Sequence, residues 1–472
     1  MVGTLGSPRG GAIDAASRAP FGWAPLVVLF VVGFVDRIEH NLLSGVLPAV
    51  QREWGFSDTA AGSIPTAAAL AAAVVALPAG YLADRLSRTR IIAVVVLVWA
   101  LATLGSGLAT GFLMFYLMRV LLAAAENIDN PASGSLLADY YPPVSRAKAY
   151  GLTRVTTHLG GVGTLLGGVL AQAFSWRTAF LVMVVPGVLT VLLAWLLREP
   201  PRGRLDRLVA AGDTSPVSAV RAAAPASPAH ACSASPASVS PASASPASAS
   251  LSPVVAELPF PRQLRQVLAI PTLVLVCAGL CLLTLGLSGI FYWLPTFMVR
   301  SLGAGTGTAG SLAGAIPVAG TLTGTLVGSW LGQRWHGTRK GGRLLAGGSG
   351  LTAGSLVLAV ALSMDSLGAM AGLLLLASSL LAIAMPNLTA SLADVVPAAS
   401  RGLGFAVLQL LTTVGGAFGS LVVGIASDRF GSLLAGMYVL APPMIVGGLL
   451  TLRARTSYER DARKVMTDAA RG

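Results

Sequence analysis

Twelve long apolar runs constrain this chain more than any other feature of its sequence. Each approaches or exceeds the roughly 20 residues that an α-helix needs to cross the hydrocarbon core of a bilayer. Only 11% of the residues are charged, whereas soluble domains carry about 25%. The chain is therefore predicted to be an all-α membrane protein with twelve transmembrane helices. The predicted spans are 24–50, 60–83, 90–109, 112–138, 147–172, 177–197, 267–298, 308–332, 343–363, 368–393, 401–426 and 431–452.

The runs fall into two groups of six, separated by a polar insert. Two similar halves are typical of secondary transporters, in which the substrate site lies between the repeats near the bilayer midplane. We therefore expect the following division of the chain: an N-terminal tail at 1–23, a first six-helix half at 24–198, a linker at 199–265, a second six-helix half at 266–452 and a C-terminal tail at 453–472.

The insert has the composition of a disordered segment. Its centre, residues 235–253, reads SPASVSPASASPASASLSP and offers almost no apolar anchors. Such a sequence cannot bury enough apolar surface to offset its ordering entropy. We interpret 208–257 as a disordered cytoplasmic tether between the halves. The alternative is a segment regulated by modification or by a partner.

Lys and Arg residues determine the expected orientation. With the N-terminus placed inside, 25 of the 32 Lys and Arg residues fall in inside segments and 4 in outside loops. Cytoplasmic loops carry such an excess, so both termini are predicted to be cytoplasmic. The same rule accounts for the net charge of +13 without binding to nucleic acid. The high Ala, Gly and Arg content is typical of a bacterium, which indicates the plasma (inner) membrane, and residues 1–20 show no cleavable signal.

A short basic loop joins the second and third spans. It contains Gly80, Asp84, Arg85 and Arg88. The Arg residues are expected to hold the loop at the cytoplasmic face, and Gly80 lets another helix approach closely. Asp84 can accept hydrogen bonds from a neighbouring helix N-terminus. We predict that this loop takes part in conformational change. The second half carries a weaker copy, in which Gln333 replaces the acid.

Ionisable residues within the spans all lie in the first half. Such residues cost about 2.5–3.5 kcal/mol on insertion scales, so they usually face a cavity or a partner. The spacing of Asp36, Glu39 and His40 puts them on one face of the first helix. Asp36, Glu126 and His158 are expected at similar depth near the midplane. The full set is Asp36, Arg37, Glu39 and His40 in the first span, Arg119, Glu126 and Asp129 in the fourth, and Arg154 and His158 in the fifth.

Simpler structural roles are open for several of these residues. Arg119 and Glu126, two turns apart, could form a fixed ion pair rather than a switching one. Glu39 and His40 could lie solvated near the outer mouth. The remaining alternatives are a hydrogen bond within the bundle for His158 and a cap or kink before Pro131 for Asp129. The Asp36-Arg37 dipeptide is the hardest to explain by packing alone.

The second half is expected to supply an apolar, weakly polar wall to the cavity. Its members are Phe291, Tyr292, Trp293, Asn387, Gln409, Thr412 and Thr413. A cavity that is charged on one side and apolar on the other suits an amphiphile with a polar head and an apolar tail. It also suits a small organic anion, with Arg37, Arg119 and Arg154 as clamps for the carboxylate.

With these residues identified, the chain resembles a spinster-type member of the major facilitator superfamily. The matching motifs are Asp36-Arg37 with Val46-Leu47-Pro48, Gly80 to Arg85 with Arg88, Arg119 and Glu126, Arg198 to Gly203, and Tyr292 to Phe297. The resemblance implies secondary transport of a lysophospholipid or sphingoid lipid by alternating access. It also implies that Asp36 and Glu126 are proton-coupling acids, and that Arg37 and Arg119 are their partners and contact the head group.

The chain departs from the spinster pattern at the cavity. After Glu126 it reads Asn-Ile-Asp-Asn-Pro, where small residues are expected, and Arg154 and His158 occupy positions expected to be aromatic or apolar. The alternative is therefore a proton-coupled organic-anion symporter of the same superfamily, which the stretch from Glu126 to Pro131 also resembles. A drug exporter is a further alternative, although the fifth span lacks the Gly-Pro expected of one.

Other classes of protein lack support in the sequence. No Gly-rich phosphate loop, metal-spaced His/Cys set or nucleophile-base arrangement stands out, so neither an enzyme nor an ATP-driven pump is expected. We predict no cofactor and no metal site. The expected partners are a small amphiphilic or anionic substrate, protons and membrane lipids, and the expected state is a monomer. A membrane sensor that uses the 199–265 insert as its output is the rival from another class.

Overall fold

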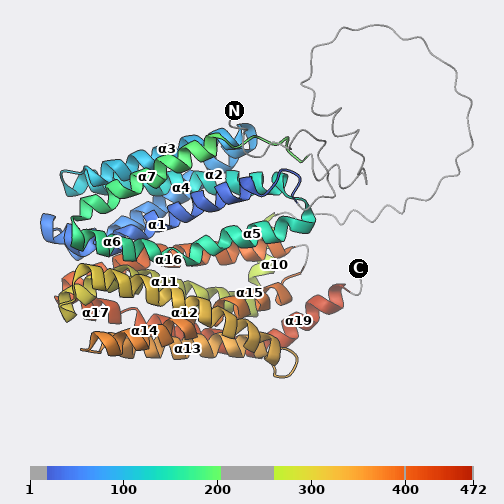
Figure 1. The fold of residues 1–472 in the computed structure, drawn as a ribbon. Coiled ribbons are helices and arrows are strands. Elements are labelled where there is room, and N and C mark those ends of the chain that lie inside the picture. Colours follow the sequence, from blue (N-terminus) through green and yellow to red (C-terminus); the bar gives the residue numbers. More distant parts are fainter. Residues whose placement is uncertain (1–18, 204–259, 398–399, 470–472) are drawn as a thin grey trace, which may run out of the picture.

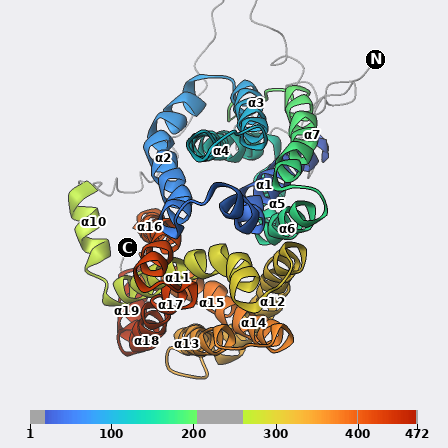
Figure 2. The same ribbon diagram turned by 90° about the vertical axis from the view of Figure 1, so that its left-hand side faces the viewer.

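The computed structural model describes residues 19–203, 260–397 and 400–469, all of them helical or in short connections. The predicted tether at 208–257 lies outside these residues. Figure 1 shows long helices running side by side, and Figure 2, which looks along the bundle, shows two groups facing each other. The first half contains α1 (Ala24–Trp54), α2 (Asp58–Arg85), α3 (Arg88–Gly107), α4 (Phe112–Tyr140), α5 (Pro143–His158), α6 (Gly161–Ala173) and α7 (Trp176–Trp195).

The second half begins with a short helix and ends with one outside the predicted spans. Its helices are α10 (Phe260–Leu268), α11 (Pro271–Leu302), α12 (Thr306–Trp335), α13 (Gly342–Leu362), α14 (Leu367–Ala382), α15 (Ala384–Val395), α16 (Arg401–Phe430), α17 (Leu433–Tyr438), α18 (Ala441–Arg453) and α19 (Arg455–Ala469). The predicted linker at 199–265 therefore ends inside α10, and the predicted tail at 453–472 contains α19.

The predicted all-α membrane fold is confirmed. Within the described residues, nine helical stretches are long and apolar enough to cross a membrane. The other three predicted spans coincide with α1, α4 and the α5–α6 pair. Two of these, α1 and α4, carry the acidic and basic residues that lower their hydropathy, and the third is split into two shorter helices. The spans that hydropathy misses are therefore the ones with ionisable side chains.

Glycines set how the helices end and how closely they cross. Gly55 and Gly303 end α1 and α11 with φ of 64° and 65°, in the left-handed region that suits glycine. Gly163 packs so tightly on α1 that an added Cβ would lie 1.8 Å from the Ile38 carbonyl oxygen. The absence of a side chain at Gly163, in the fifth predicted span, therefore allows this close helix crossing.

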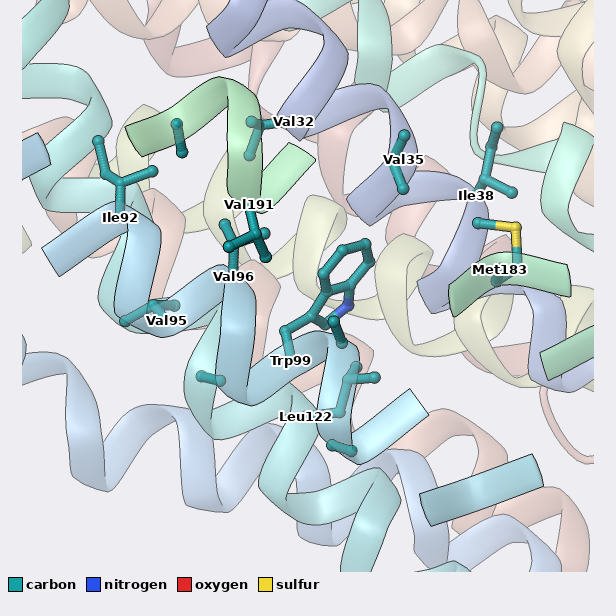
Figure 3. Close-up of a cluster of buried hydrophobic side chains, with 14 of the residues drawn as sticks. Val32, Val35, Ile38, Ile92, Val95, Val96, Trp99, Leu122, Met183 and Val191 are labelled. Carbon is teal, nitrogen blue, oxygen red and sulfur yellow. The ribbon is translucent and has the colours of Figure 1, made fainter. Parts of the chain in front are cut away.

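Each half has its own hydrophobic core. Figure 3 shows part of the first core, where Trp99 of α3 lies among side chains of α1, α4 and α7. Val35 and Ile38 of α1 and Leu122 of α4 are each at most 6% exposed. Because α1 and α4 are packed together in one core, the ionisable residues on their other faces are held at fixed relative positions.

Candidate functional site

A cavity of about 870 Å³ lies between the two halves. This volume is within the range of about 300–1,000 Å³ that is usual for ligand pockets. The first half contributes polar side chains to its wall, among them His40, Asn41, Ser44, Arg119, Glu126 and Thr164. The second half contributes Leu287, Phe291, Tyr292, Val318, Gln409 and Thr413. The cavity is therefore charged on one side and mainly apolar on the other.

Ionisable residues pair across α1 and α4. Arg119 donates to the Glu39 carboxylate over 2.5 Å, and both side chains are buried. Nδ1 of His40 lies 3.2 Å from Oε2 of Glu126. The alternative in which Arg119 pairs with Glu126 is therefore not what the structure contains. The two residues are seven positions apart, about 10 Å along the helix, and α1 presents a closer partner to each.

The alternative in which Glu39 lies solvated at the outer mouth does not hold, because its side chain is fully buried. Its second oxygen, Oε2, is buried without a hydrogen-bond partner among the described residues. The Arg119 guanidinium also lies 5.5 Å from the centre of the Phe180 ring. Arg119 thus lies between an acid on α1 and an aromatic ring on α7. It lines the cavity although most of its side chain is buried.

Asp36 and Glu126 form a second link between the helices. Their carboxyl groups are near enough to interact electrostatically, and Arg37 Nε lies 3.4 Å from the Asp36 carboxylate. Two ionised carboxylates at such a separation repel each other. Among the described residues, the cavity wall includes Glu126 but not Asp36, Arg37 or Glu39. Glu126 is therefore the acid through which the cavity meets this pair.

Three ionisable residues predicted within the spans have side chains outside the described set. Arg154 and His158 lie on α5, and Asp129 lies on α4, where only the helical backbone is described. Their predicted roles remain predictions. Thr157, next to His158, lines the cavity, so this end of α5 borders the site.

The apolar wall is partly as predicted. Tyr292 and Gln409 line the cavity. Trp293 does not line the cavity, because it follows Tyr292 on the helix and therefore points about 100° away from it. Trp293 is fully buried and donates to the Ser420 carbonyl over 2.9 Å. Asn387 also lies away from the cavity, since its amide donates to the Gly328 carbonyl. Both predictions assigned a face to a residue that the helix turns into the core.

Polar contacts join the halves at one end of the bundle. Arg300 of α11 donates to both carboxylate oxygens of Asp58 at 2.9 Å. Asp428 of α16 accepts from the Asp58 and Thr59 backbone amides. Gln172 of α6 accepts from the Gly307 amide over 2.6 Å. These contacts lie beside the 55–57 and 303–305 connections, so the cavity is closed at that end.

None of these closing residues is among the predicted site residues. The available signal was their position at helix ends: Asp58 stands in the first turn of α2 and Arg300 in the last turn of α11. Charged residues at such positions usually interact with the end of their own helix. Their presence in the sequence therefore does not predict a contact between the two halves.

The loop between α2 and α3 is tied to the start of the linker. Arg88 is fully buried within the protein, so it holds the loop through contacts with other residues rather than through solvent. It forms an ion pair with Asp139 and donates to Glu199 over 2.7 Å and to the Pro200 carbonyl over 3.0 Å. Arg85 is exposed, as expected for a surface residue. The side chains of Gly80 and Asp84 lie outside the described set, so their predicted roles remain predictions.

Glu199 is held in its charged form by this arrangement. Burial raises the pKa of its carboxyl group, but hydrogen bonds from the Thr89 amide and from Arg88 outweigh burial, and the pKa lies below its ordinary value. The linker thus begins in ordered structure at 199–203, because Glu199 and Pro200 supply acceptors to a buried guanidinium.

The sequence profile of the Major Facilitator Superfamily matches residues 29–378 and 276–469. The chain belongs to the major facilitator superfamily. It is therefore a multi-pass membrane transporter, and alternating access between two halves fits its architecture. Two crystal structures of a bacterial homolog of the human lysosomal transporter Spinster, both inward-facing, have the same fold, with a TM-score of 0.71 at 21% identity over 94% of this chain and 97% of that chain.

Curated relatives include spinster proteins and transporters named for organic anions. Human "Protein spinster homolog 1" is 30% identical over 187 residues, 39% of this chain and 35% of that protein. The "Hexuronate transporter" of Bacillus subtilis is 27% identical over 195 residues, 40% of this chain and 46% of that protein. The "Gallate transporter" of Pseudomonas putida is 29% identical over 192 residues, 40% and 43%. The matches span less than half of these relatives. The predicted resemblance to spinster-type members of the superfamily is confirmed.

Proposed function

We propose that this transporter moves an amphiphilic lipid, of the lysophospholipid or sphingoid class, in exchange with or together with protons. The observation that carries the proposal is the two-sided cavity. His40, Arg119 and Glu126 line one side, and Leu287 and Phe291 line the other. A polar head group is favoured beside the charged residues, and an apolar tail is favoured against the second half.

The proposed proton coupling is supported by the charges of those site residues whose side chains are described. The acidic residues are Asp36, Glu39 and Glu126, and the basic residues are Arg37 and Arg119. With all three carboxyl groups ionised and His40 neutral, these groups carry a net charge of −1, and one proton makes the set neutral. A neutral set is cheaper to hold in the membrane interior. Either acid of the Asp36–Glu126 pair can take up that proton, which removes the repulsion between the two carboxylates.

The transport cycle uses the contacts between the halves. The excess of Lys and Arg at the other end supports an orientation in which the 55–57 and 303–305 connections face outward and both termini face the cytoplasm. The cavity is then closed to the outside, as in an inward-facing transporter. Opening outward requires separation of Arg300 from Asp58. We propose that the protein does this as a monomer in the inner membrane of a bacterium.

A second candidate is an organic-anion transporter. The relatives include proteins named as hexuronate, muconate and gallate transporters. Arg119 borders the cavity and can bind a carboxylate. Its charge is already balanced by Glu39, however, which reduces the field that an anion meets and makes this candidate second. A drug exporter comes third, since one relative is a "Puromycin resistance protein".

Uptake into proteoliposomes under an imposed pH gradient tests the proposal. A labelled lysophospholipid is compared with a small labelled carboxylate, and liposomes without protein serve as the control. We expect lysophospholipid movement that follows the gradient. Movement of the carboxylate alone would contradict the lipid proposal and make Arg119 a direct ligand of the substrate.

A further inference from the structure

The short helix α10 precedes the first span of the second half. Figure 2 shows α10 at the outer edge of the bundle, and it packs on α11 and α16. Only Ala269 and Ile270 separate it from α11. Ile270 is extended, with φ of −83° and ψ of 106°, so the chain bends between the two helices and α10 does not simply prolong the span.

The length of α11 places α10 at the level of the lipid head groups. The apolar stretch Pro271–Ser301 has 31 residues, which extend over about 46 Å at 1.5 Å per residue. A bilayer is about 40–45 Å thick when its head groups are included. Because the stretch is as long as the whole bilayer, its first residue lies among the head groups of one leaflet. The helix joined to that residue lies there too.

One side of α10 is apolar and the other is basic. Leu264, Val267 and Leu268 are three and four positions apart, so they share one side of the helix. Arg262 and Arg265 share the opposite side, and both are exposed. The bundle covers Val267, which is 1% exposed, but Leu268 remains 46% exposed. Within the described part of the chain, the apolar side of α10 is therefore only partly covered by protein.

The corner between α10 and α16 is basic. The first turn of α16 adjoins the start of α11, since a Cβ added to Gly404 would lie 3.5 Å from Leu273 Cδ1. This turn begins with the exposed Arg401. Among 260–268 and 401–404, all the charged residues are arginines. Asp461 also meets the start of α11, but it is 9% exposed and accepts from Thr272. An anion that approaches this corner therefore meets a positive surface.

We propose that α10 lies in the head-group region of the bilayer and binds the phosphate of an anionic phospholipid through Arg262 and Arg265. Leu264 and Leu268 then contact the upper part of the acyl chains, as the apolar side of an interfacial helix does. Guanidinium groups bind phosphate through paired, charge-assisted hydrogen bonds. The site is separate from substrate binding, because no residue of α10 lines the central cavity.

Lipid binding tests the arginines. Phosphatidylglycerol and phosphatidylcholine with the same acyl chains are titrated into the full-length protein in detergent, and native mass spectrometry measures the bound fractions. A basic residue near the membrane surface contributes about 1 kcal/mol to binding of anionic lipid, so each arginine removed should weaken phosphatidylglycerol binding about fivefold. The double variant Arg262→Gln/Arg265→Gln should show this loss with unchanged phosphatidylcholine binding, and Arg262→Lys/Arg265→Lys should keep most of the affinity.

A second double variant removes the same charge elsewhere. Arg52 and Arg429 are exposed residues beyond the opposite ends of the spans, and Arg52→Gln/Arg429→Gln should keep the phosphatidylglycerol affinity of the wild type. Equal losses in the two glutamine variants would show that binding follows total charge, and no loss in Arg262→Gln/Arg265→Gln would show that α10 is not the site. Either result would overturn the inference without affecting the proposed substrate.

Spin labels test the position of α10. Leu268→Cys and Gln266→Cys are made in a variant whose three native cysteines are replaced by alanine, and EPR in proteoliposomes measures collisions with oxygen and with a water-soluble nickel chelate. We expect the label at 268 to favour oxygen, which concentrates among acyl chains, and the label at 266 to favour nickel. Frequent nickel collisions at both positions would place α10 in water, and few collisions of either kind at 268 would mean that protein covers this side. Both results contradict the proposal.

Discussion

At the scale of single residues, the site consists of acids on α1 and α4 that each have a defined neighbour. Asp36 and Glu126 lie near each other, and Glu39 accepts a hydrogen bond from Arg119. The first pair reaches the cavity through Glu126, whereas the second is fully buried on its acidic side. The two pairs are therefore expected to respond differently to substitution.

Neutralising the first pair is expected to abolish coupling. In Asp36→Asn and in Glu126→Gln one acid of the pair can no longer take up or release a proton, so uptake driven by a pH gradient should fall to the level measured without a gradient. The protein should remain folded, because an amide has the shape of the acid. Glu53→Gln, an acid at the end of α1 bonded to Trp176, is the control. Coupling that survives in both variants would contradict the proposed proton site.

Breaking the second pair is expected to cost stability. Arg119→Met leaves the Glu39 carboxylate buried without its counter-charge, and removal of one partner of a buried pair costs about 3–5 kcal/mol. Adding Glu39→Met should restore most of the loss, because an apolar pair needs no compensation. Unfolding by denaturant measures both. If the double variant is no more stable than Arg119→Met, the ion pair is not the source of the loss.

Sequence reasoning singles out the ionisable residues of this site, but it does not predict that Arg119 pairs with Glu39 or that His40 contacts Glu126. A charge within a membrane span is rare, so Asp36, Arg119 and Glu126 stand out from hydropathy alone. Which acid meets which base depends on how α1 rotates against α4, and that rotation is set by packing in the first core. The same limit explains why Trp293 was assigned to the cavity although it faces the core.

At the scale of helices and loops, the described structure adds breaks and anchors that hydropathy does not record. The fifth predicted span divides into α5 and α6 around residues 159–160, and the tenth divides into α14 and α15 at Ile383. Each predicted span is correct in position, because apolar length determines it. The breaks occur where backbone hydrogen bonds of the helix are not formed. Because apolar residues lie on both sides of each break, hydropathy does not reveal them.

The anchor at Glu199 should depend on pH. Its pKa is lowered in the folded protein, so its stabilising contribution is present above the ordinary pKa of glutamate and is lost as pH falls through the lowered value. We expect Glu199→Gln to reduce stability by roughly 1–2 kcal/mol near neutral pH, the value of a partly exposed hydrogen bond to a charged group, and by less in acid. Unfolding of both proteins across pH 3–7 measures this. A constant difference would show that the charge of Glu199 is not involved.

The second half has a similar contact after its own second helix, formed by different residues. Arg343 follows the loop after α12, as Arg88 follows the loop after α2, and it donates to Asp394 over 2.6 Å. Tyr458 of α19 donates to the same carboxylate over 2.6 Å. The C-terminal helix thus packs where the linker packs in the first half. The sequence alone showed only a weaker copy of the loop.

At the scale of the whole molecule, closure depends on a small set of contacts between the halves. Arg300→Gln removes the bidentate donor to Asp58 and should favour the outward-open state. A distance measured by pulsed EPR between labels on the 55–57 and 303–305 connections is expected to lengthen. Arg177→Gln, which affects an ion pair within the first half, should leave it unchanged. An unaltered distance in Arg300→Gln would mean that Arg300 is not needed for closure.

The contact between α6 and α12 has a further consequence for the cycle. Gly161 and Gly168 meet Gly314 and Gly310 so closely that an added Cβ would lie within 2.8 Å of the opposing backbone. Peptide surfaces without side chains have no rotamers to rearrange when they part or rejoin. The two halves can therefore separate at this point without any rearrangement of side chains. Substitution of any of these four glycines by Ala would keep α6 and α12 apart, and it would therefore bias the transporter away from the state in which its outer side is closed.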